Sequence, residues 1–345
     1  MARLAVEVSS PKEYSNMSFL DYWRAIKTQL DEEFVHLIPE FFENLSAQEI
    51  EAIHGILKDG KRVRGCLVSL MSHALGGKIE DAIPRAMAIE CIQAASLIHD
   101  DYVDGDTVRR NRPAVWTIEG PRKAVLLGDV IFATALQKMI ETSQRDGLVI
   151  TQAIATTAAG AYRELHAAPD LAQALAEGKY RREHYNLIIH LKTGALFGAA
   201  SQLGAISAGA SSELSARAFK FGSHVGEAYQ IADDLEEVMN LEAESEQLSA
   251  KMSLLTPVFL YFSRETDLRL ARLLDGKEDN FQSWLEQVRT VLKMRMGGEI
   301  ANRLERATSE IRHFPENCYT KMLDAAPSEI VRMIQKTTSS EAVTN

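Results

Sequence analysis

The sequence predicts an all-α protein. Apolar residues recur every three or four positions through long stretches, for example from Ile89 to Leu97 and from Leu187 to Leu196, whereas strict two-residue alternation is scarce. The 345 residues include only 20 glycines and 9 prolines, which gather at a few points such as Gly76-Gly77, Gly120-Pro121 and Gly297-Gly298. We therefore expect long helices separated by short breaks.

The expected helices follow one another at these breaks. The break at residues 57–61 separates the second helix from the third, Gly76-Gly77 follows the third, and Gly120-Pro121 precedes the fifth. No linker rich in Pro, Gly or Ser divides the chain and no repeat of fixed period is present, so residues 1–345 are expected to form a single domain with a frayed polar tail from Lys336 to Asn345. In chain order, the expected helices span residues 16–36, 47–57, 61–75, 83–105, 122–143, 147–164, 169–206, 212–241, 249–264, 266–275 and 280–311.

Composition and charge narrow the class of protein. Hydrophobic residues make up 46% and charged residues 25%, as in soluble globular proteins. The 38 Lys+Arg and 48 Asp+Glu give a net charge of −10, which offers no general attraction for nucleic acid. Cys66, Cys91 and Cys318 follow no metal-binding or CxxC spacing. No apolar window is long enough for a transmembrane segment or a signal peptide, so we expect a reduced, cytoplasmic protein.

The sharpest local signal is the acidic end of the fourth expected helix, His99-Asp100-Asp101-Tyr102-Val103-Asp104. Asp100 and Asp104 fall about 40° apart on a helix and roughly 6 Å along one face, whereas Asp101 is turned about 100° away. Two carboxylates at this spacing repel each other and oppose the helix dipole unless a cation lies between them. Because hard divalent cations take oxygen ligands, the pair is either a solvated helix end or a Mg²⁺ site.

A second helix end strengthens the metal interpretation. Gly226 to Glu237, with the sequence GEAYQIADDLEE, again follows an apolar approach and places Asp233 and Glu237 on one stripe. Two such helix ends facing each other would form a metal-lined mouth.

Basic residues suggest what the metal ions would hold. Gly60-Lys61-Arg62-Val63-Arg64 opens one helix, where backbone N–H groups and the helix dipole favour an anion. Arg109-Arg110 follows the first acidic motif, and Lys192-Thr193 lies inside an otherwise apolar helix. Each basic residue alone is more often a solvated surface charge. Together with two acidic helix ends they predict a site for a diphosphate held by metal ions, Arg and Lys.

With these motifs in this order, the sequence resembles the trans-isoprenyl diphosphate synthases, the polyprenyl synthetase family, of the geranylgeranyl or longer-chain type. The resemblance is strongest over residues 60–257. It implies the all-helical isoprenoid synthase fold with a central cavity, a homodimer, Mg²⁺ as cofactor, and isopentenyl diphosphate and an allylic diphosphate as substrates. It rests on GKRVR at 60–64, Gln93 seven residues before DDYVD at 100–104, Arg109-Arg110, Leu127-Gly128-Asp129, Lys192-Thr193-Gly194, YQIADD at 229–234 and Lys251-Met252-Ser253-Leu254.

The resemblance also implies roles for individual residues. Mg²⁺ would be bound by Asp100, Asp104, Asp233 and Glu237. The allylic diphosphate site would comprise Asp100, Asp104, Arg109, Lys192 and Asp233, with Lys251 as a basic residue near the metals. The isopentenyl diphosphate site would comprise Lys61, Arg64, Gln93 and Arg110. Thr193 and Gln230 would face the developing allylic cation and form the catalytic set with Lys192 and Arg109.

The family's chemistry explains these residue types. Metal ions and basic side chains draw charge onto the departing diphosphate, the isopentenyl double bond attacks the resulting allylic cation, and a proton is lost. The walls below must exclude water. The small and apolar run from Gly194 to Ala200 suits such a wall. Close packing against another helix explains the run at least as well, and the two are compatible.

Residues before the first acidic motif bear on product length. In the family a bulky aromatic residue four or five positions before the first Asp stops growth at fifteen carbons, and here these positions are Ser96 and Ala95. We therefore expect a product of twenty carbons or more, with Ile92, Ile89 or Phe132 at the floor of the pocket. Close helix packing is the alternative reason for two small residues.

The sequence departs from the family pattern in three places. Glu237 stands where a third Asp is usual, the stretch before Lys251 is short and lacks the usual Gly-Lys pair, and Gly65 replaces a proline.

Two alternative functions stay open. A class I terpene cyclase shares the first acidic motif but needs no isopentenyl site, which GKRVR and Arg110 indicate. A weakly active or regulatory subunit of a heteromeric prenyl synthase is supported by the altered second motif and opposed by the intact first one.

Overall fold

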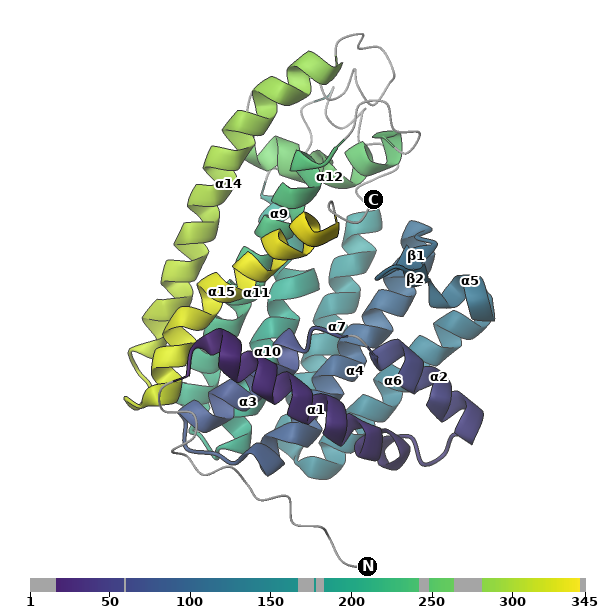
Figure 1. Ribbon diagram of the computed structural model, residues 1–345, viewed down its shortest axis with the longest axis vertical. Helices are drawn as coiled ribbons and strands as arrows, with labels where there is room; N and C mark the ends of the chain where they lie inside the picture. Colours follow the sequence, from purple (N-terminus) through teal and green to yellow (C-terminus); the bar gives the residue numbers. More distant parts are fainter. Residues whose placement is uncertain are drawn as a thin grey trace, which may run out of the picture. The chain divides into compact units, whose positions relative to one another are not determined.

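The computed structural model describes residues 17–58, 60–166, 177, 183–241, 248–263 and 281–341, and helices dominate this part of the chain (Figure 1). The all-α prediction is confirmed. In chain order the elements are α1 (Phe19–Phe41), α2 (Ala47–Leu57), α3 (Val63–Ala74), α4 (Ile79–Asp104), β1 (Val108–Arg109), β2 (Arg112–Pro113), α5 (Val115–Glu119), α6 (Pro121–Thr142), α7 (Gln144–His166), α9 (His184–Ile189), the π-turn η1 (His190–Gly194), α10 (Ala195–Ser207), α11 (Ser212–Met239), α12 (Leu248–Phe262), α14 (Phe281–Ile311) and α15 (Cys318–Glu341).

The expected helices match most of these elements within a few residues. The helix expected at 169–206 corresponds in its described part to α9, η1 and α10, and the helix expected at 266–275 lies outside the described residues. Two of the described helices were not predicted, the short α5 and the long α15. α15 contains Pro327 in its interior, which disguises a run of buried apolar residues spaced three and four apart. It continues through Glu341 into the expected frayed tail, of which residues 342–345 lie outside the described part.

Local signals in the sequence explain where several helices begin and end. The Ser18 hydroxyl accepts a hydrogen bond from the Asp21 N–H at the start of α1. Ser46 and Glu49 form a reciprocal capping box at the start of α2. α4 ends where Gly105 adopts φ 73°, a left-handed conformation that glycine reaches without strain.

The chain divides into two compact units, which we describe separately. The first comprises Met1–Gly147, Ala200–Ala218 and Glu310–Glu329, and the second comprises Leu148–Ala199, Phe219–Ser309 and Ile330–Asn345. The single domain expected over residues 1–345 stays a prediction. Among the described helices, none combines the length and the hydropathy that crossing a bilayer requires.

The first unit is organised around α4. This helix packs against α3 and α6 and also contacts α1, α2 and α5. Its residues Met87, Ile89 and Ile92 are fully buried, and buried residues lie on all its sides. A helix surrounded in this way is held by packing along most of its length. The first acidic motif is therefore attached to a rigid element.

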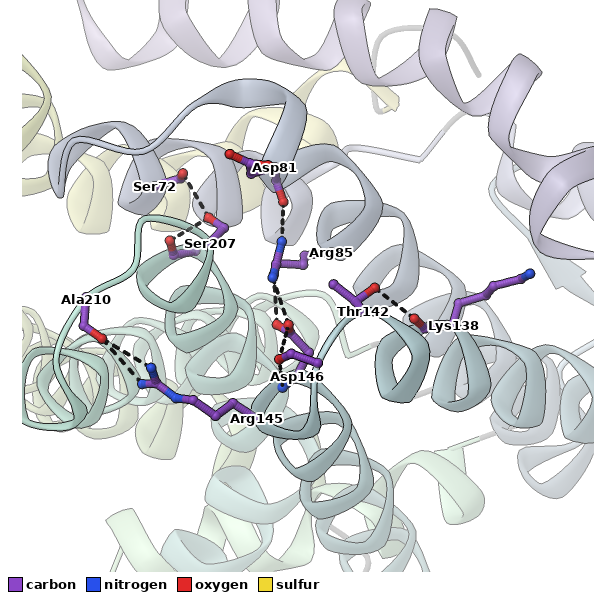
Figure 2. Close-up of polar contacts among 11 residues, drawn as sticks. Ser72, Asp81, Arg85, Lys138, Thr142, Arg145, Asp146, Ser207 and Ala210 are labelled. Carbon is purple, nitrogen blue, oxygen red and sulfur yellow. Dashed lines mark hydrogen bonds and ion pairs between the residues drawn. The ribbon is translucent and has the colours of Figure 1, made fainter.

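A buried ion pair fixes α4 to the start of α7 (Figure 2). Arg85 donates two hydrogen bonds of 2.7 Å to Asp146, from Nε to Oδ1 and from Nη2 to Oδ2. Asp146 is completely buried, and its Oδ2 also accepts a 2.6 Å hydrogen bond from the Ser143 hydroxyl. Both carboxylate oxygens are thus satisfied, as a buried charge requires.

The second unit has its own hydrophobic core between α9, α11, α12 and α14. Ile231, Phe259, Leu285 and Met296 are fully buried in it, and the ring of Trp284 lies against that of Phe259 with 5.4 Å between centroids. This core supports α11, which carries the second acidic motif.

Candidate active site

The first acidic motif occupies the last turns of α4. Asp100 is half-buried and Asp104 is exposed, whereas Asp101 is only 3% exposed. The difference agrees with the helical geometry expected from the sequence, in which Asp100 and Asp104 share a face and Asp101 points elsewhere.

Asp101 is held by a small hairpin that follows α4. β1 pairs antiparallel with β2, and Arg110 and Asn111 between them have φ values of 51° and 58°, typical of a tight hairpin turn. Nε of Arg109 donates a 2.7 Å hydrogen bond to Oδ1 of Asp101. Burial raises the pKa of the Asp101 carboxyl, and the bond to Arg109 opposes this shift. Arg109 thus lies beside the first motif with its guanidinium bound to a carboxylate.

A pocket lies next to α4 in the first unit. Its walls bring together Gln93 and Arg110, two of the four residues predicted to bind isopentenyl diphosphate, and Gly60, which precedes Lys61. Lys61 is exposed and Arg64 is half-buried. The lining residues are Ile56, Leu57, Gly60, Arg62, Glu90, Gln93, Ala94, Leu97, Ile98, Asp101 and Arg110.

The residues predicted to set product length lie in the packed part of α4. Ile92 and Ala95 are fully buried, as is Ile89, while Ser96 is half-buried and donates a 2.9 Å hydrogen bond to the Gln93 carbonyl. Phe132 on α6 is half-buried.

α6 approaches α4 closely at the level of His99. The rings of His99 and Phe132 lie 5.5 Å apart between centroids, and Nε2 of His99 contacts the Val125 carbonyl at 3.0 Å. A Cβ atom at Gly128 would overlap the His99 ring. Gly128 of the LGD motif is therefore needed for this approach.

In the second unit, η1 carries Lys192 and Thr193. The Thr193 hydroxyl donates a 2.6 Å hydrogen bond to Oε1 of Gln230, and Nε2 of Gln230 donates one of 2.8 Å to Oδ1 of Asp234. The Tyr185 hydroxyl donates to the other Asp234 oxygen at 2.6 Å. Burial raises the pKa of Asp234 to about 7, although both bonds oppose this. Thr193 and Gln230, the two residues predicted to face the allylic cation, are thus hydrogen-bonded to each other.

Sequence reasoning missed the acidic partners of η1. Lys192 forms an ion pair with Glu164 of α7. Glu227 of α11 lies 2.8 Å from Nδ1 of His190, and Nε of Arg303 lies 2.7 Å from its other oxygen. Glu164 belongs to no motif. Glu227 is a carboxylate on an apolar helix face, a signal that could have marked it as buried and paired.

The small residues after Lys192 permit a close crossing of helices. A Cβ at Gly194 would lie 3.1 Å from Cγ of Glu227 and 3.2 Å from the Ser223 carbonyl oxygen, and one at Gly198 would overlap Ser223. The structure thus supports close packing of Gly194 and Gly198 against α11.

The carboxylates of the two acidic motifs are suitable ligands for a divalent metal. Asp233 is half-buried and Glu237 exposed, one turn apart on α11 as Asp100 and Asp104 are on α4. Among the described side chains, no three His, Cys, Asp or Glu residues gather around one point. Hard cations such as Mg²⁺ commonly take one or two carboxylates and complete their shell with phosphate oxygens and water. Lys251 lies in α12, and its side chain is outside the described part.

Comparison with known proteins identifies the family. The pattern of the polyprenyl synthetase family matches residues 48–253. This chain belongs to the polyprenyl synthetase family. It is 33% identical over 275 residues to a short chain isoprenyl diphosphate synthase of Methanothermobacter thermautotrophicus, covering 76% of this chain and 82% of that protein. It is 33% identical over 240 residues to a hexaprenyl pyrophosphate synthase of Saccharolobus solfataricus, covering 68% and 78%.

A solved structure agrees with this family assignment. The geranylgeranyl pyrophosphate synthetase of Pyrococcus horikoshii superposes with a TM-score of 0.71 at 27% identity, over 94% of this chain and 99% of that one. The isoprenoid synthase fold and the prenyltransferase reaction predicted from the sequence are therefore confirmed. Polyprenyl synthetases act with a divalent metal, which the carboxylate pairs on α4 and α11 suit. The relatives differ in product length, so family membership alone does not fix it.

Proposed function

We propose that this polyprenyl synthetase condenses isopentenyl diphosphate with an allylic diphosphate, with Mg²⁺ as the metal, and releases a product of twenty carbons or more. The observation that carries the proposal is the pocket beside α4, where Gln93, Arg110 and the glycine before Lys61 meet near the first acidic motif. A terpene cyclase ionises a single substrate and needs no second diphosphate site. A pocket with this lining favours an elongating enzyme.

The allylic diphosphate would be bound mainly by carboxylate-held metal. Asp100 and Asp104 in the first unit and Asp233 and Glu237 in the second are the proposed ligands. When bound, the metal neutralises the diphosphate and makes it a better leaving group. Lys192 would exchange Glu164 for a diphosphate oxygen, with Arg109 and Lys251 as further basic partners.

Thr193 and Gln230 are proposed to face the cation formed when the diphosphate departs. Their oxygen atoms are hydrogen-bonded to each other at 2.6 Å, so the Thr193 hydroxyl is oriented before substrate arrives. Oriented dipoles stabilise a developing charge without reorganising during the reaction. The half-buried Asp234 carboxylate fixes Gln230 in turn.

The isopentenyl diphosphate would bind through Lys61, Arg64, Gln93 and Arg110. Its diphosphate keeps its charge throughout the reaction, whereas the allylic diphosphate gains charge only as it leaves. Arg110→Ala or Gln93→Ala should therefore mainly raise the KM for isopentenyl diphosphate, and Lys192→Ala should mainly lower kcat. Equal effects of all three on both substrates would contradict the division.

The product length is proposed from the small residues of α4. Ala95 and Ser96 offer no aromatic barrier before the first acidic motif, and Ile92 and Phe132 are the candidate floor. Ala95→Phe or Ser96→Phe should shorten the product toward fifteen carbons without weakening Mg²⁺ binding. An unmodified enzyme that already stops at fifteen carbons would refute this assignment.

We also propose a cytoplasmic homodimer. Cys66, Cys91 and Cys318 are all free thiols, which suits a reducing compartment. Leu126, Ala133 and Ile140 are exposed at intervals of seven on α6, so they lie on one face of the helix. Leu126→Glu should convert a dimer into monomers in analytical ultracentrifugation.

Product analysis tests the reaction itself. Purified protein is incubated with Mg²⁺, isopentenyl diphosphate and allylic diphosphates of five, ten and fifteen carbons, and products are separated by chain length. Elongated diphosphates of twenty carbons or more support the proposal. A cyclic hydrocarbon from the allylic substrate alone would indicate a cyclase, and turnover only after addition of a second protein would indicate a regulatory subunit.

A further inference from the structure

The turn that joins α2 to α3 carries an arginine in an unusual setting. Arg62 has φ 53° and ψ 27°, a left-handed conformation that residues other than glycine rarely adopt. Its side chain is only 4% exposed, although a buried guanidinium ion is strongly disfavoured unless it is paired. A residue that is both left-handed and buried persists only where its surroundings hold it in place.

Contacts from three directions hold the Arg62 side chain. Nε donates a 2.8 Å hydrogen bond to Oδ1 of Asp31 on α1, and Nη2 donates one of 2.5 Å to the Leu57 carbonyl. The guanidinium carbon lies 4.9 Å from the centre of the Phe34 ring, a cation–π contact. Nη1 is 3.6 Å from Oε2 of Glu90 on α4. Arg62 therefore connects α1, the turn and α4.

Glu90 completes this connection. It is 7% exposed, and its Oε1 accepts a 2.8 Å hydrogen bond from the Gly65 N–H in the first turn of α3, where the helix dipole favours negative charge. Proline has no N–H group, so the glycine that departs from the family pattern at this position supplies the donor. A Cβ at position 65 would lie 3.0 Å from the Cδ1 atom of Leu30, at the flexible end of that side chain.

Arg62 and Glu90 both line the pocket that contains Gln93 and Arg110. Glu90 and Gln93 are three residues apart on α4 and lie on neighbouring positions of one face. An uncompensated carboxylate there would repel a diphosphate, and Arg62 supplies the compensating charge. Lys61 directly precedes Arg62 in the chain, so the backbone conformation at Arg62 fixes how the turn presents the Lys61 side chain. The Lys61 carbonyl is itself tied to α1 by a 2.9 Å hydrogen bond from Nε1 of Trp23.

We propose that Arg62 and Glu90 are positioning residues for the diphosphate of isopentenyl diphosphate. Their contact, together with the bond from Glu90 to the Gly65 N–H, holds the turn of residues 60–64 in the conformation that binds this substrate. The inference rests on the proposed function, because it deepens the isopentenyl site of that proposal. Gly65 serves this conformation by donating the N–H that a proline lacks.

Substitutions of Glu90 and Gly65 separate positioning from general stability. Isopentenyl diphosphate binding is measured by titration calorimetry, which needs no turnover, and the KM for each substrate is measured alongside. Glu90→Ala should weaken isopentenyl diphosphate binding at least about tenfold and leave the KM for the allylic substrate within about twofold. Glu90→Gln keeps an acceptor for the Gly65 N–H and should recover part of the loss. Gly65→Pro should weaken binding more than Gly65→Ala, which keeps the N–H.

Asp146→Asn is the matched control. Asp146 is likewise a buried carboxylate paired with an arginine in the first unit, and it does not line the pocket. This variant should lower the thermal midpoint and leave isopentenyl diphosphate affinity unchanged. A Glu90→Ala protein with a lowered midpoint and wild-type affinity, or equal affinities of Gly65→Pro and Gly65→Ala, would overturn the inference.

Two results distinguish the positioning roles of Arg62 and Glu90 from the proposed function. A wild-type protein that binds isopentenyl diphosphate and forms no elongated product would refute the proposed function, while the graded loss of binding in the variants would still support the positioning of this diphosphate. Elongation by the wild type together with unchanged binding in every Glu90 variant would refute only the positioning roles.

Discussion

Replacing Glu227 by Gln should destabilise the second unit and change its response to acid. The Glu227 carboxylate is the centre of a cluster in which His190 lies 2.8 Å and His224 3.4 Å from its two oxygens, and Nε of Arg303 lies 2.7 Å away. Its side chain is only 10% exposed. Glutamine has nearly the same size and lacks the charge, so the substitution removes the electrostatic attraction with little change in packing.

The expected size of the effect comes from the pKa of this carboxyl. Burial alone would raise the pKa of Glu227, but hydrogen bonds with His190 and His224 and the charge of Arg303 lower it from 4.5 to about 2. This difference corresponds to about 3 kcal/mol of folding free energy. Because the pKa is lower in the folded state, the contribution is fully present above about pH 5 and is lost as the pH falls toward 2. Glu227→Gln should therefore be about 3 kcal/mol less stable at pH 7, with the difference shrinking in acid.

Urea unfolding between pH 7 and pH 3 measures this difference. Trp284 lies in the core of the second unit, so a background with Trp23→Phe and Trp116→Phe leaves one fluorescent reporter for that unit. Glu305→Gln, at an exposed position of α14, is the control and should change stability by less than about 0.5 kcal/mol. A Glu227→Gln protein whose free energy of unfolding runs parallel to that of the wild type across this pH range would contradict a charge-stabilised Glu227 cluster.

Other predictions follow from single contacts. Arg85→Ala leaves the completely buried Asp146 without its cation and should cost about 3–5 kcal/mol in urea unfolding; a loss under about 1 kcal/mol would contradict a buried ion pair. Gly128→Ala places a methyl group against the His99 ring and should lower stability by about 1–3 kcal/mol, with a shift of the His99 NMR signals; unchanged signals would show that α6 and α4 are farther apart. Excess chelator should abolish turnover, and Asp100→Ala should reduce kcat by about 10²-fold or more; full activity in chelator would remove the metal from the mechanism.

Periodicity predicts the helices well because most of them bury one stripe of apolar residues. The bounds of α2 agree with the expected residues 47–57, where a capping box marks the start. α15 was missed although its buried residues Met322, Leu323, Ile330 and Ile334 follow helical spacing, because Pro327 interrupts the sequence pattern. Pattern and propensity describe each helix by itself, and a proline inside a helix is tolerated when packing compensates for it.

The sequence predicts the motifs of the candidate site but not the residues that hold these motifs in place. Helical geometry alone indicates that Asp101 turns away from Asp100, and the structure adds that Arg109 of the hairpin holds it. Neither the left-handed backbone of Arg62 nor its bond to Asp31 has a sequence signature, since the conformation is rare for any residue other than glycine and the bond joins residues 31 positions apart. Residues that only hold the binding residues in position are found when the tertiary contacts are known.

The π-turn His190–Gly194 has a consequence for insertions and deletions. A π-turn holds one residue more than the α-helical turn it replaces, so it shifts the residues that follow by about 100° around the helix axis. Deleting Leu191 would allow an uninterrupted α-helix from α9 into α10, favourable in its own hydrogen bonds, but would carry Thr193 away from Gln230. The position of the Thr193 hydroxyl thus depends on the number of residues in this segment as much as on their identity. Sequences that align here without a gap can share this geometry, and a sequence one residue shorter cannot, however similar its side chains are.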